Sequence, residues 1–165
     1  MRERRPASEA EAGALASGIR LRIIRLTYAE ALTNKEIAER LGRDPATTLF
    51  HVRKLVETGF LAPQPVRKGK RGAKEIPYLS TGLSWELSGG PDKALSEAML
   101  EAYLAEIADL DPGELDQSRL VVRIDPDERT EFERRLAELL DEFRNRSRPD
   151  AGEHLAIYVA TYPSR

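Results

Sequence analysis

Residues 33–59 constrain the fold more than any other part of the sequence. Thr33 stands three residues before Glu36, and a Thr-x-x-Glu pattern ahead of apolar residues is typical of a helix start, because the two side chains cap each other's backbone N–H groups. Gly42 is placed to end this helix, since glycine readily adopts the left-handed conformation found at helix C-termini. An Asp-Pro pair follows at once and predicts a second helix start.

The second helix is expected over residues 45–58, and its spacing turns Thr48, Val52 and Leu55 inward. Two short helices joined by a glycine turn predict a helix-turn-helix, whose second helix enters the major groove of DNA. An ordinary three-helix bundle remains the alternative for this stretch alone. On the helix-turn-helix interpretation, the residues of the second helix expected to contact DNA are Ala46, Thr47, Phe50, Arg53 and Lys54.

The sequence around this motif predicts a winged helix-turn-helix. Apolar residues at helical spacing precede it from about residue 15 to 31, and two short extended segments follow it around a glycine-rich tip, which indicates a β-hairpin. Five cations stand within eight residues of this hairpin, and no acid stands among them. A solvated run of charge is the plain interpretation, but a cationic hairpin here is also placed to lie along phosphates. These cations are Arg67, Lys68, Lys70, Arg71 and Lys74.

The expected fold class is α+β and mainly helical. We expect a disordered N-terminal arm over residues 1–13, a winged helix-turn-helix domain over 14–88 and a smaller helix/β-α-β domain over 89–165, with the Ser-Gly-Gly-Pro stretch as linker. The elements expected in the last domain are a helix over 92–110, a strand over 120–124, a helix that starts at Asp125-Pro126, and a strand over 155–162.

The helix over 92–110 is the expected seam of a homodimer, and the last domain is expected to serve dimerisation and to bind an effector, if there is one. Two-fold symmetric dimers match palindromic DNA sites, so a homodimer agrees with a DNA-binding role. The residues expected at the seam are Leu95, Met99, Ala102 and Leu104.

Charge and composition favour a double-stranded DNA partner and exclude several other classes. Residues 1–85 hold 16 Lys and Arg against 9 Asp and Glu, a balance of +7, whereas residues 86–165 hold 10 against 19, a balance of −9. The chain has no cysteine, which excludes disulfides, thiolate metal sites and cysteine nucleophiles. No secretory signal or membrane-spanning segment is expected, and the expected location is the cytoplasm. We expect no cofactor and no metal.

The stretch IAERLGRDPATTLFHVRKLVETGFLAP, at positions 37–63, resembles the DNA-reading segment of ArsR-type winged helix regulators, in particular a longer subgroup with a C-terminal strand–helix–strand extension. The resemblance covers Leu15 to Trp85 and extends more loosely to the C-terminal part. It implies a homodimeric repressor or activator whose operator affinity an effector changes. It favours Thr47, Phe50 and Arg53 for DNA contact, while Leu49 replaces a small polar residue. The cysteines that the family's metal sensors use do not occur here.

Several weaker signals each have a plain interpretation beside a functional one. His51 and His154 are expected to be packed or surface residues rather than metal ligands. No nucleophile–base pair or phosphate-binding loop indicates an enzyme. The rival to a DNA-reading regulator is an architectural or adaptor protein whose acidic half binds another protein. Arg2, Arg4 and Arg5 are candidates for a minor-groove arm, and Trp85, Tyr103, Tyr158 and Tyr162 are candidates for a ligand pocket.

Overall fold

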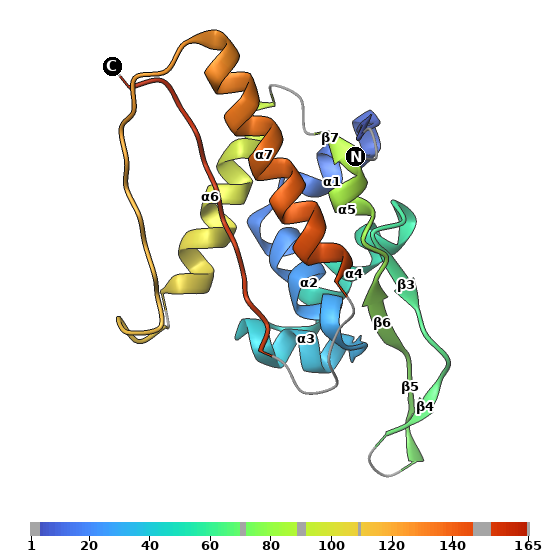
Figure 1. Cartoon of the computed structure of the whole chain (residues 1–165). Coiled ribbons are helices and arrows are strands. Elements are labelled where there is room, and N and C mark those ends of the chain that lie inside the picture. The colour runs from blue at the N-terminus through green and yellow to red at the C-terminus, as the bar shows by residue number, and fades with distance from the viewer. Residues whose placement is uncertain (1–3, 70–71, 89–91, 109, 147–152, 165) are drawn as a thin grey trace. The chain divides into compact units, whose positions relative to one another are not determined.

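A computed structural model gives the fold (Figure 1). The chain divides into two compact units, Arg2–Asp111 and Pro112–Arg165. None of the helices in the described part of the chain has the length and apolarity that crossing a membrane requires. The residues that the structure describes are 4–69, 72–88, 92–108, 110–146 and 153–164.

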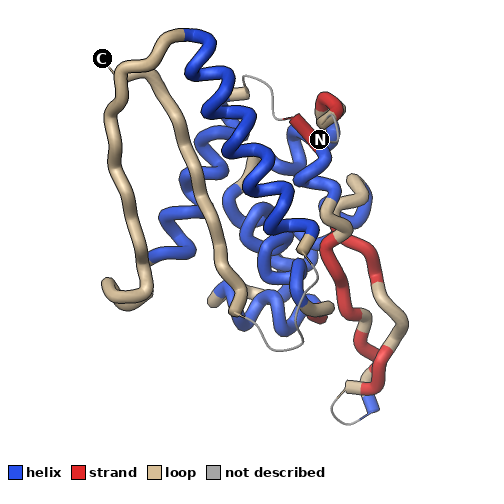
Figure 2. The backbone as a smooth tube through the Cα atoms, in the orientation of Figure 1, coloured by secondary structure: helices blue, strands red, loops and turns tan. Residues whose placement is uncertain are grey.

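The first unit is mainly helical with three small sheets, as the tube of Figure 2 shows. Its elements in chain order are β1 (Arg5–Pro6), α1 (Glu9–Leu15), α2 (Gly18–Ala29), β2 (Leu32–Thr33), α3 (Asn34–Leu41), α4 (Pro45–Glu57), β3 (Leu61–Pro63), β4 (Arg67–Lys68), β5 (Lys74–Glu75), β6 (Pro77–Ser80), α5 (Leu83–Glu86), β7 (Leu87–Ser88) and α6 (Lys93–Ile107).

The core of this unit lies where α2, α3 and α4 meet β3. Its fully buried apolar side chains include Ile23, Ile37, Val52, Leu55 and Phe60. The predicted hairpin forms, since β3 pairs antiparallel with β6, and further out β4 pairs antiparallel with β5. The sheet also gains β2, which pairs with β6 and which the sequence pattern missed because two residues carry no detectable period.

The N-terminal segment differs from the disordered arm expected over residues 1–13. From residue 4 onward it is ordered, because β1 pairs in parallel with β7 and a capping box of Ser8 and Glu11 starts α1. The Arg5 guanidinium donates to both carboxylate oxygens of Glu11 at 2.9 and 2.6 Å, and this contact lowers the pKa of Glu11 to about 2. The guanidinium of Arg4 lies 4.2 Å from the ring centroid of Trp85. Two of the candidate arm arginines are therefore held on their own unit, and Arg2 lies outside the described residues.

Helix α6 belongs to the first unit, so the division of the chain lies between residues 111 and 112 rather than at the Ser-Gly-Gly-Pro stretch. The reason is its packing on α2, where Gly18 leaves room for α6: a Cβ there would lie 2.7 Å from Cδ of Glu101. An ion pair between Arg25 and Glu106, 2.8 Å long, joins the same two helices. Burial raises the pKa of Glu106, against the opposing effect of Arg25.

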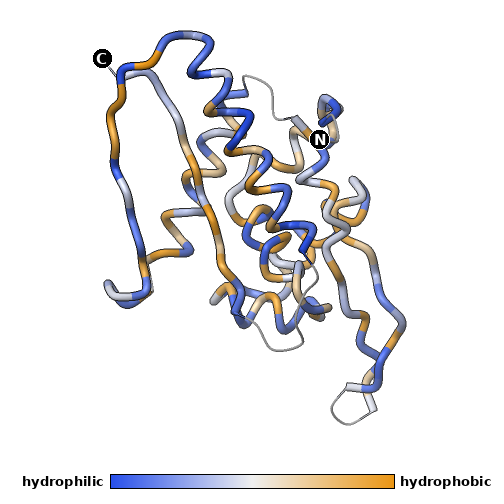
Figure 3. Tube along the Cα trace, viewed as in Figure 1, coloured by the Kyte–Doolittle hydropathy of each residue, from blue (hydrophilic) through white to orange (hydrophobic). Residues whose placement is uncertain are grey.

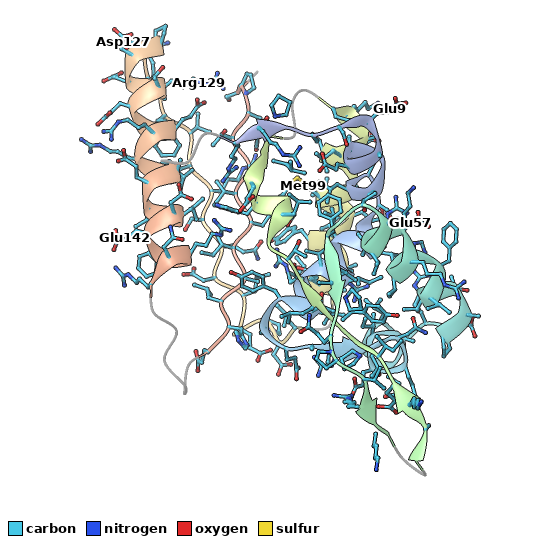
Figure 4. The ribbon with its side chains drawn as sticks, turned by 90° about the vertical axis from the view of Figure 1, so that its right-hand side faces the viewer. Glu9, Glu57, Met99, Asp127, Arg129 and Glu142 are labelled. Carbon is cyan, nitrogen blue, oxygen red and sulfur yellow. The ribbon has the colours of Figure 1, made fainter. Side chains whose placement is uncertain are left out.

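The packing of α6 also separates the four expected seam residues into two pairs. Leu95 and Ala102 are buried in the first unit's own interior, at 7% and 6% exposure. Met99, labelled in Figure 4, and Leu104 are 44% and 53% exposed. Only the second pair lies on a surface that another chain can reach.

The second unit, Pro112–Arg165, contains α7 (Pro126–Asn145) between two extended segments. The predicted helix start is correct, because Asp125 and Glu128 form a capping box and Pro126 occupies the first turn. The predicted strands over 120–124 and 155–162 do not form: both segments are extended (Figure 1), but neither takes part in a sheet of the described residues. Sequence pattern detects a preference for extended backbone, whereas a strand also needs a neighbour to accept its hydrogen bonds.

Candidate nucleic-acid interface

Helices α3 and α4 are joined by a short turn with the capping that the sequence predicts. Thr33 and Glu36 form the capping box of α3, and Gly42 ends that helix in the left-handed conformation, at a φ of 61° that a side chain would strain. The side-chain amide of Asn34 donates to the backbone oxygen of Pro45 at 2.9 Å and so ties the start of α3 to the start of α4. The angle between the two helices is held by local bonds as well as by the core.

Helix α4 presents two distinct faces. Thr48, Val52 and Leu55 are buried, as their spacing predicts. On the other side, Ala46, Thr47, Phe50 and Arg53 are exposed, and Phe50 is 66% exposed. An exposed phenylalanine and an exposed arginine one turn apart, on a helix whose other side is buried, form a surface able to meet base edges and methyl groups in a groove.

The expected DNA residues at the two ends of α4 are engaged within the chain. At the start, the carboxylate of Asp44 accepts from the backbone N–H of Thr47 at 2.9 Å and from its hydroxyl at 3.3 Å. Lys54 is partly buried, and its ammonium lies 3.7 Å from Glu57, the last residue of α4 (labelled in Figure 4). Arg53 is placed differently, because it makes no ion pair with any residue that the structure describes.

The hairpin extends from the helices as a narrow ribbon, hydrophilic along β4 and β5 (Figure 3). In its register Lys68 lies directly opposite Lys74, and Arg67 lies opposite Glu75. Like charges in a directly opposed pair destabilise a ribbon, and an anion between them relieves the repulsion. The two lysines are therefore suited to hold a phosphate. The other two expected cations, Lys70 and Arg71, lie outside the described residues.

Arg67 faces the protein instead. Its guanidinium lies 2.5 Å from a carboxylate oxygen of Glu36 on α3 and 3.4 Å from Glu75 on the neighbouring strand. Side chains of successive strand residues point to opposite sides, so Lys68 lies on the face of β4 opposite to Arg67. The contact holds the base of the hairpin against α3, and the hydrogen bond to Glu36 raises the pKa of Arg67. Arg67 is better described as positioning the hairpin than as a free cation.

Glu36 therefore has two partners. One carboxylate oxygen accepts from the backbone N–H of Thr33 at 2.7 Å, and the other meets Arg67. The backbone hydrogen bond from Thr33 lowers the pKa of Glu36 most, and Arg67 lowers it further. Sequence reasoning identified the cap but missed the second contact, because Glu36 and Arg67 are 31 positions apart.

We expect Glu36→Gln to lower the free energy of unfolding by a few tenths of a kcal/mol at pH 7, since glutamine keeps the cap but loses a partly exposed ion pair. Because the pKa of Glu36 is lower in the folded state, its contribution is present above its ordinary value of 4.5 and is lost as the pH falls below it. The wild-type and the variant should therefore converge in acid. Urea denaturation at several pH values measures this, with Glu153→Gln as control, since Glu153 is exposed and makes no ion pair with a described residue. A difference that persists in acid would contradict the expectation.

His51 lies at the inner margin of α4. It is half-buried, its Nδ1 is buried without a hydrogen-bond partner among the described residues, and its ring stands edge-on to Phe50 at 5.4 Å between centroids. Burial lowers its pKa, and the positive charges of Arg20 and Arg43 lower it further. The residue is thus a neutral packing residue at neutral pH. No group of three or more His, Asp or Glu side chains within the described ranges is arranged to hold a metal.

Arg43 is a candidate that sequence reasoning missed. It lies exposed in the turn between α3 and α4, and its charge is close enough to lower the pKa of His51. The available signal was a lone cation at the turn of a helix-turn-helix, where phosphates pass close to the protein backbone.

Three helices followed by an antiparallel hairpin define this part of the chain as a winged helix-turn-helix domain, a class of domain that binds DNA. The comparison with protein families agrees, since residues 15–64 match the family model described as a helix-turn-helix domain. No curated protein matches the sequence.

Solved structures with some likeness to the chain include those of three other proteins. A cysteine-to-serine mutant of Lactococcus lactis ZitR aligns with a TM-score of 0.37 and 18% identity, over 76% of this chain and 73% of that one. The transcriptional regulator SlyA gives 0.35 and 15%, over 76% of each chain, and the transcriptional regulator PA3341 gives 0.31 and 19%, over 80% and 82%.

Proposed function

We propose that the protein is a transcriptional regulator that reads a specific double-stranded DNA sequence, with α4 in the major groove and the hairpin along the phosphates. The observation that carries the proposal is the outer surface of α4, where Phe50 and Arg53 are exposed beside a buried opposite face. Arg53 can donate two hydrogen bonds to a guanine, and Phe50 can contact a thymine methyl group. Lys68 and Lys74 supply affinity that does not depend on sequence.

The protein acts in this proposal as a homodimer on a two-fold symmetric operator. Winged and other helix-turn-helix dimers place their reading helices about 34 Å apart, one turn of DNA. The exposed apolar residues of α6, Met99 and Leu104 among them, form the seam that we propose. Leu95 and Ala102 lie on the buried side of α6 and hold this helix in place by packing it on α2. The resemblance to ArsR-type regulators favours the same assembly and an effector that changes operator affinity.

The test is fluorescence anisotropy of the full chain with the DNA upstream of its own coding sequence, with a shuffled version of that DNA, and with single half-sites. Tighter binding to the intact upstream DNA supports the proposal. Equal binding to both sequences would instead support an architectural or adaptor role, and no binding at low salt would exclude a DNA partner.

The salt dependence of binding distinguishes the phosphate contacts of the hairpin from the base contacts of α4. We expect the double variant Lys68→Ala/Lys74→Ala to reduce the steepness of the log–log plot of affinity against salt by about 2, because each of the two copies loses the phosphate held between its two lysines. Its preference for upstream over shuffled DNA should stay nearly unchanged, since phosphate contacts carry no sequence information. An unchanged slope would show that the two lysines do not touch the backbone.

A further inference from the structure

The second unit, Pro112–Arg165, lacks an interior of its own. None of its described residues, 112–146 and 153–164, is buried. Much of the apolar stripe of α7 is open to solvent: Phe132 and Leu139 are each 50% exposed and Phe143 is 54% exposed, while Leu136 and Leu140 are partly buried. Apolar side chains at helical spacing on one face are typical of a helix that packs against a partner.

The two extended segments of this unit also lack strand partners among the described residues. Figure 1 shows both segments running in the same direction, opposite to α7, which is the path of a β-α-β unit. Leu120 and Leu155, in the two segments, are 81% and 84% exposed, and no described residue pairs with the backbone of either segment. A pair of strands is marginally stable alone, whereas three or more strands covered by helices are stable.

We propose that the Pro112–Arg165 units of two copies of this chain form one shared β-sheet, with both α7 helices covering one face. Each copy contributes the segments around 120–124 and 155–162, so that the shared sheet has four strands. The inference rests on the homodimer of the proposed function and names a second interface within it.

The charges of α7 favour a second copy over a charged partner. On its polar side, arginines and glutamates pair within the helix, as in the contacts of Arg134 with Glu131 and Glu138 at 2.7 and 2.6 Å. These side chains are therefore engaged with each other and leave little unpaired charge to attract a partner. The unit holds 9 Lys and Arg against 12 Asp and Glu, a balance of −3, so two copies repel each other only weakly.

The exposed apolar area of the Pro112–Arg165 unit is also large enough to form a stable interface between two copies. Eleven large apolar residues of the described unit are exposed, and together they present on the order of 1,000 Å² per copy. A stable protein interface buries roughly 800 Å² per partner. A second copy meets both needs of the unit at once, because it covers the apolar faces and supplies the missing strands.

Hydrogen–deuterium exchange of the full chain without DNA, followed over a 100-fold range of protein concentration, tests the proposal. Amides of 120–124 and 155–162 should be protected, and the protection should fall on dilution as the mass measured by light scattering falls to that of a monomer. Leu139→Asp should remove the protection and raise the dimer dissociation constant at least tenfold. Thr130→Asp, which adds the same charge on the opposite side of α7, should do neither.

A more conservative variant distinguishes loss of the interface from loss of the fold. Val122→Thr keeps the volume and the preference for extended backbone, and we expect it to raise the dissociation constant several-fold with no change in helix content. Protection that does not depend on concentration would mean that the unit closes within one chain, and lack of protection would mean that no sheet forms; either result overturns the proposal. Because no DNA is present, the outcome is independent of whether the protein reads an operator.

Discussion

Replacing Arg53 by alanine should weaken binding to the operator by about 1 to 3 kcal/mol, or roughly 5- to 150-fold. Arg53 is exposed on α4 and is not paired with any described acid, so its two donors are available to a guanine. Binding to shuffled DNA should weaken much less. Anisotropy titrations of both probes at one salt concentration measure the two effects.

Two further variants distinguish a base contact of Arg53 from a general effect of its positive charge. Arg53→Lys keeps the charge but not the planar pair of donors, so it should keep binding to shuffled DNA while losing most of the preference for the operator. Arg135→Ala removes the same charge from an exposed position on α7 and should leave both affinities within twofold. Equal losses on the two probes for Arg53→Ala would assign Arg53 to phosphate rather than base contact.

Replacing Phe60 by alanine should lower the free energy of unfolding by about 3 to 5 kcal/mol. Phe60 is 1% exposed and joins α4 to the sheet: its backbone N–H donates to Leu55 at 2.9 Å, and its oxygen accepts from the N–H of Thr81 at 3.0 Å. The variant loses the buried ring at the junction between the reading helix and the hairpin. Thermal and urea denaturation of the full chain measure the loss.

Phe50→Ala is the matched control, because it makes the same change at an exposed position of α4. We expect its stability to stay within about 0.5 kcal/mol of the wild-type. Its operator affinity should fall, since the thymine contact is lost. If Phe50→Ala destabilised the fold as much as Phe60→Ala, the exposed position of Phe50 and its proposed role would both be incorrect.

Elements whose signals are local could be predicted from the sequence. Helix starts at Thr33, Asp44 and Asp125 depend on contacts between residues two to four positions apart, and each of them appears in the structure. The inward face of α4 follows from helical spacing alone, so the burial of Thr48, Val52 and Leu55 was predicted correctly, whereas Lys54, predicted on the outer side, is partly buried. The same holds for the hairpin that follows α4.

Contacts between segments that are far apart in the sequence could not be predicted in this way. These contacts decide which helix faces are buried, which charges form ion pairs and which strands pair. Arg67 was expected among the cations that lie along phosphates but forms an ion pair with Glu36, and β1 pairs with a strand about 80 positions away. Leu95 and Leu104 look alike in the sequence, yet α2 buries the first and leaves the second exposed. The segments 120–124 and 155–162 prefer extended backbone but have no strand partner within the described chain. Local preference acts through neighbouring residues, whereas burial, ion pairing and strand pairing depend on segments that only the folded chain, or a second copy of it, brings together.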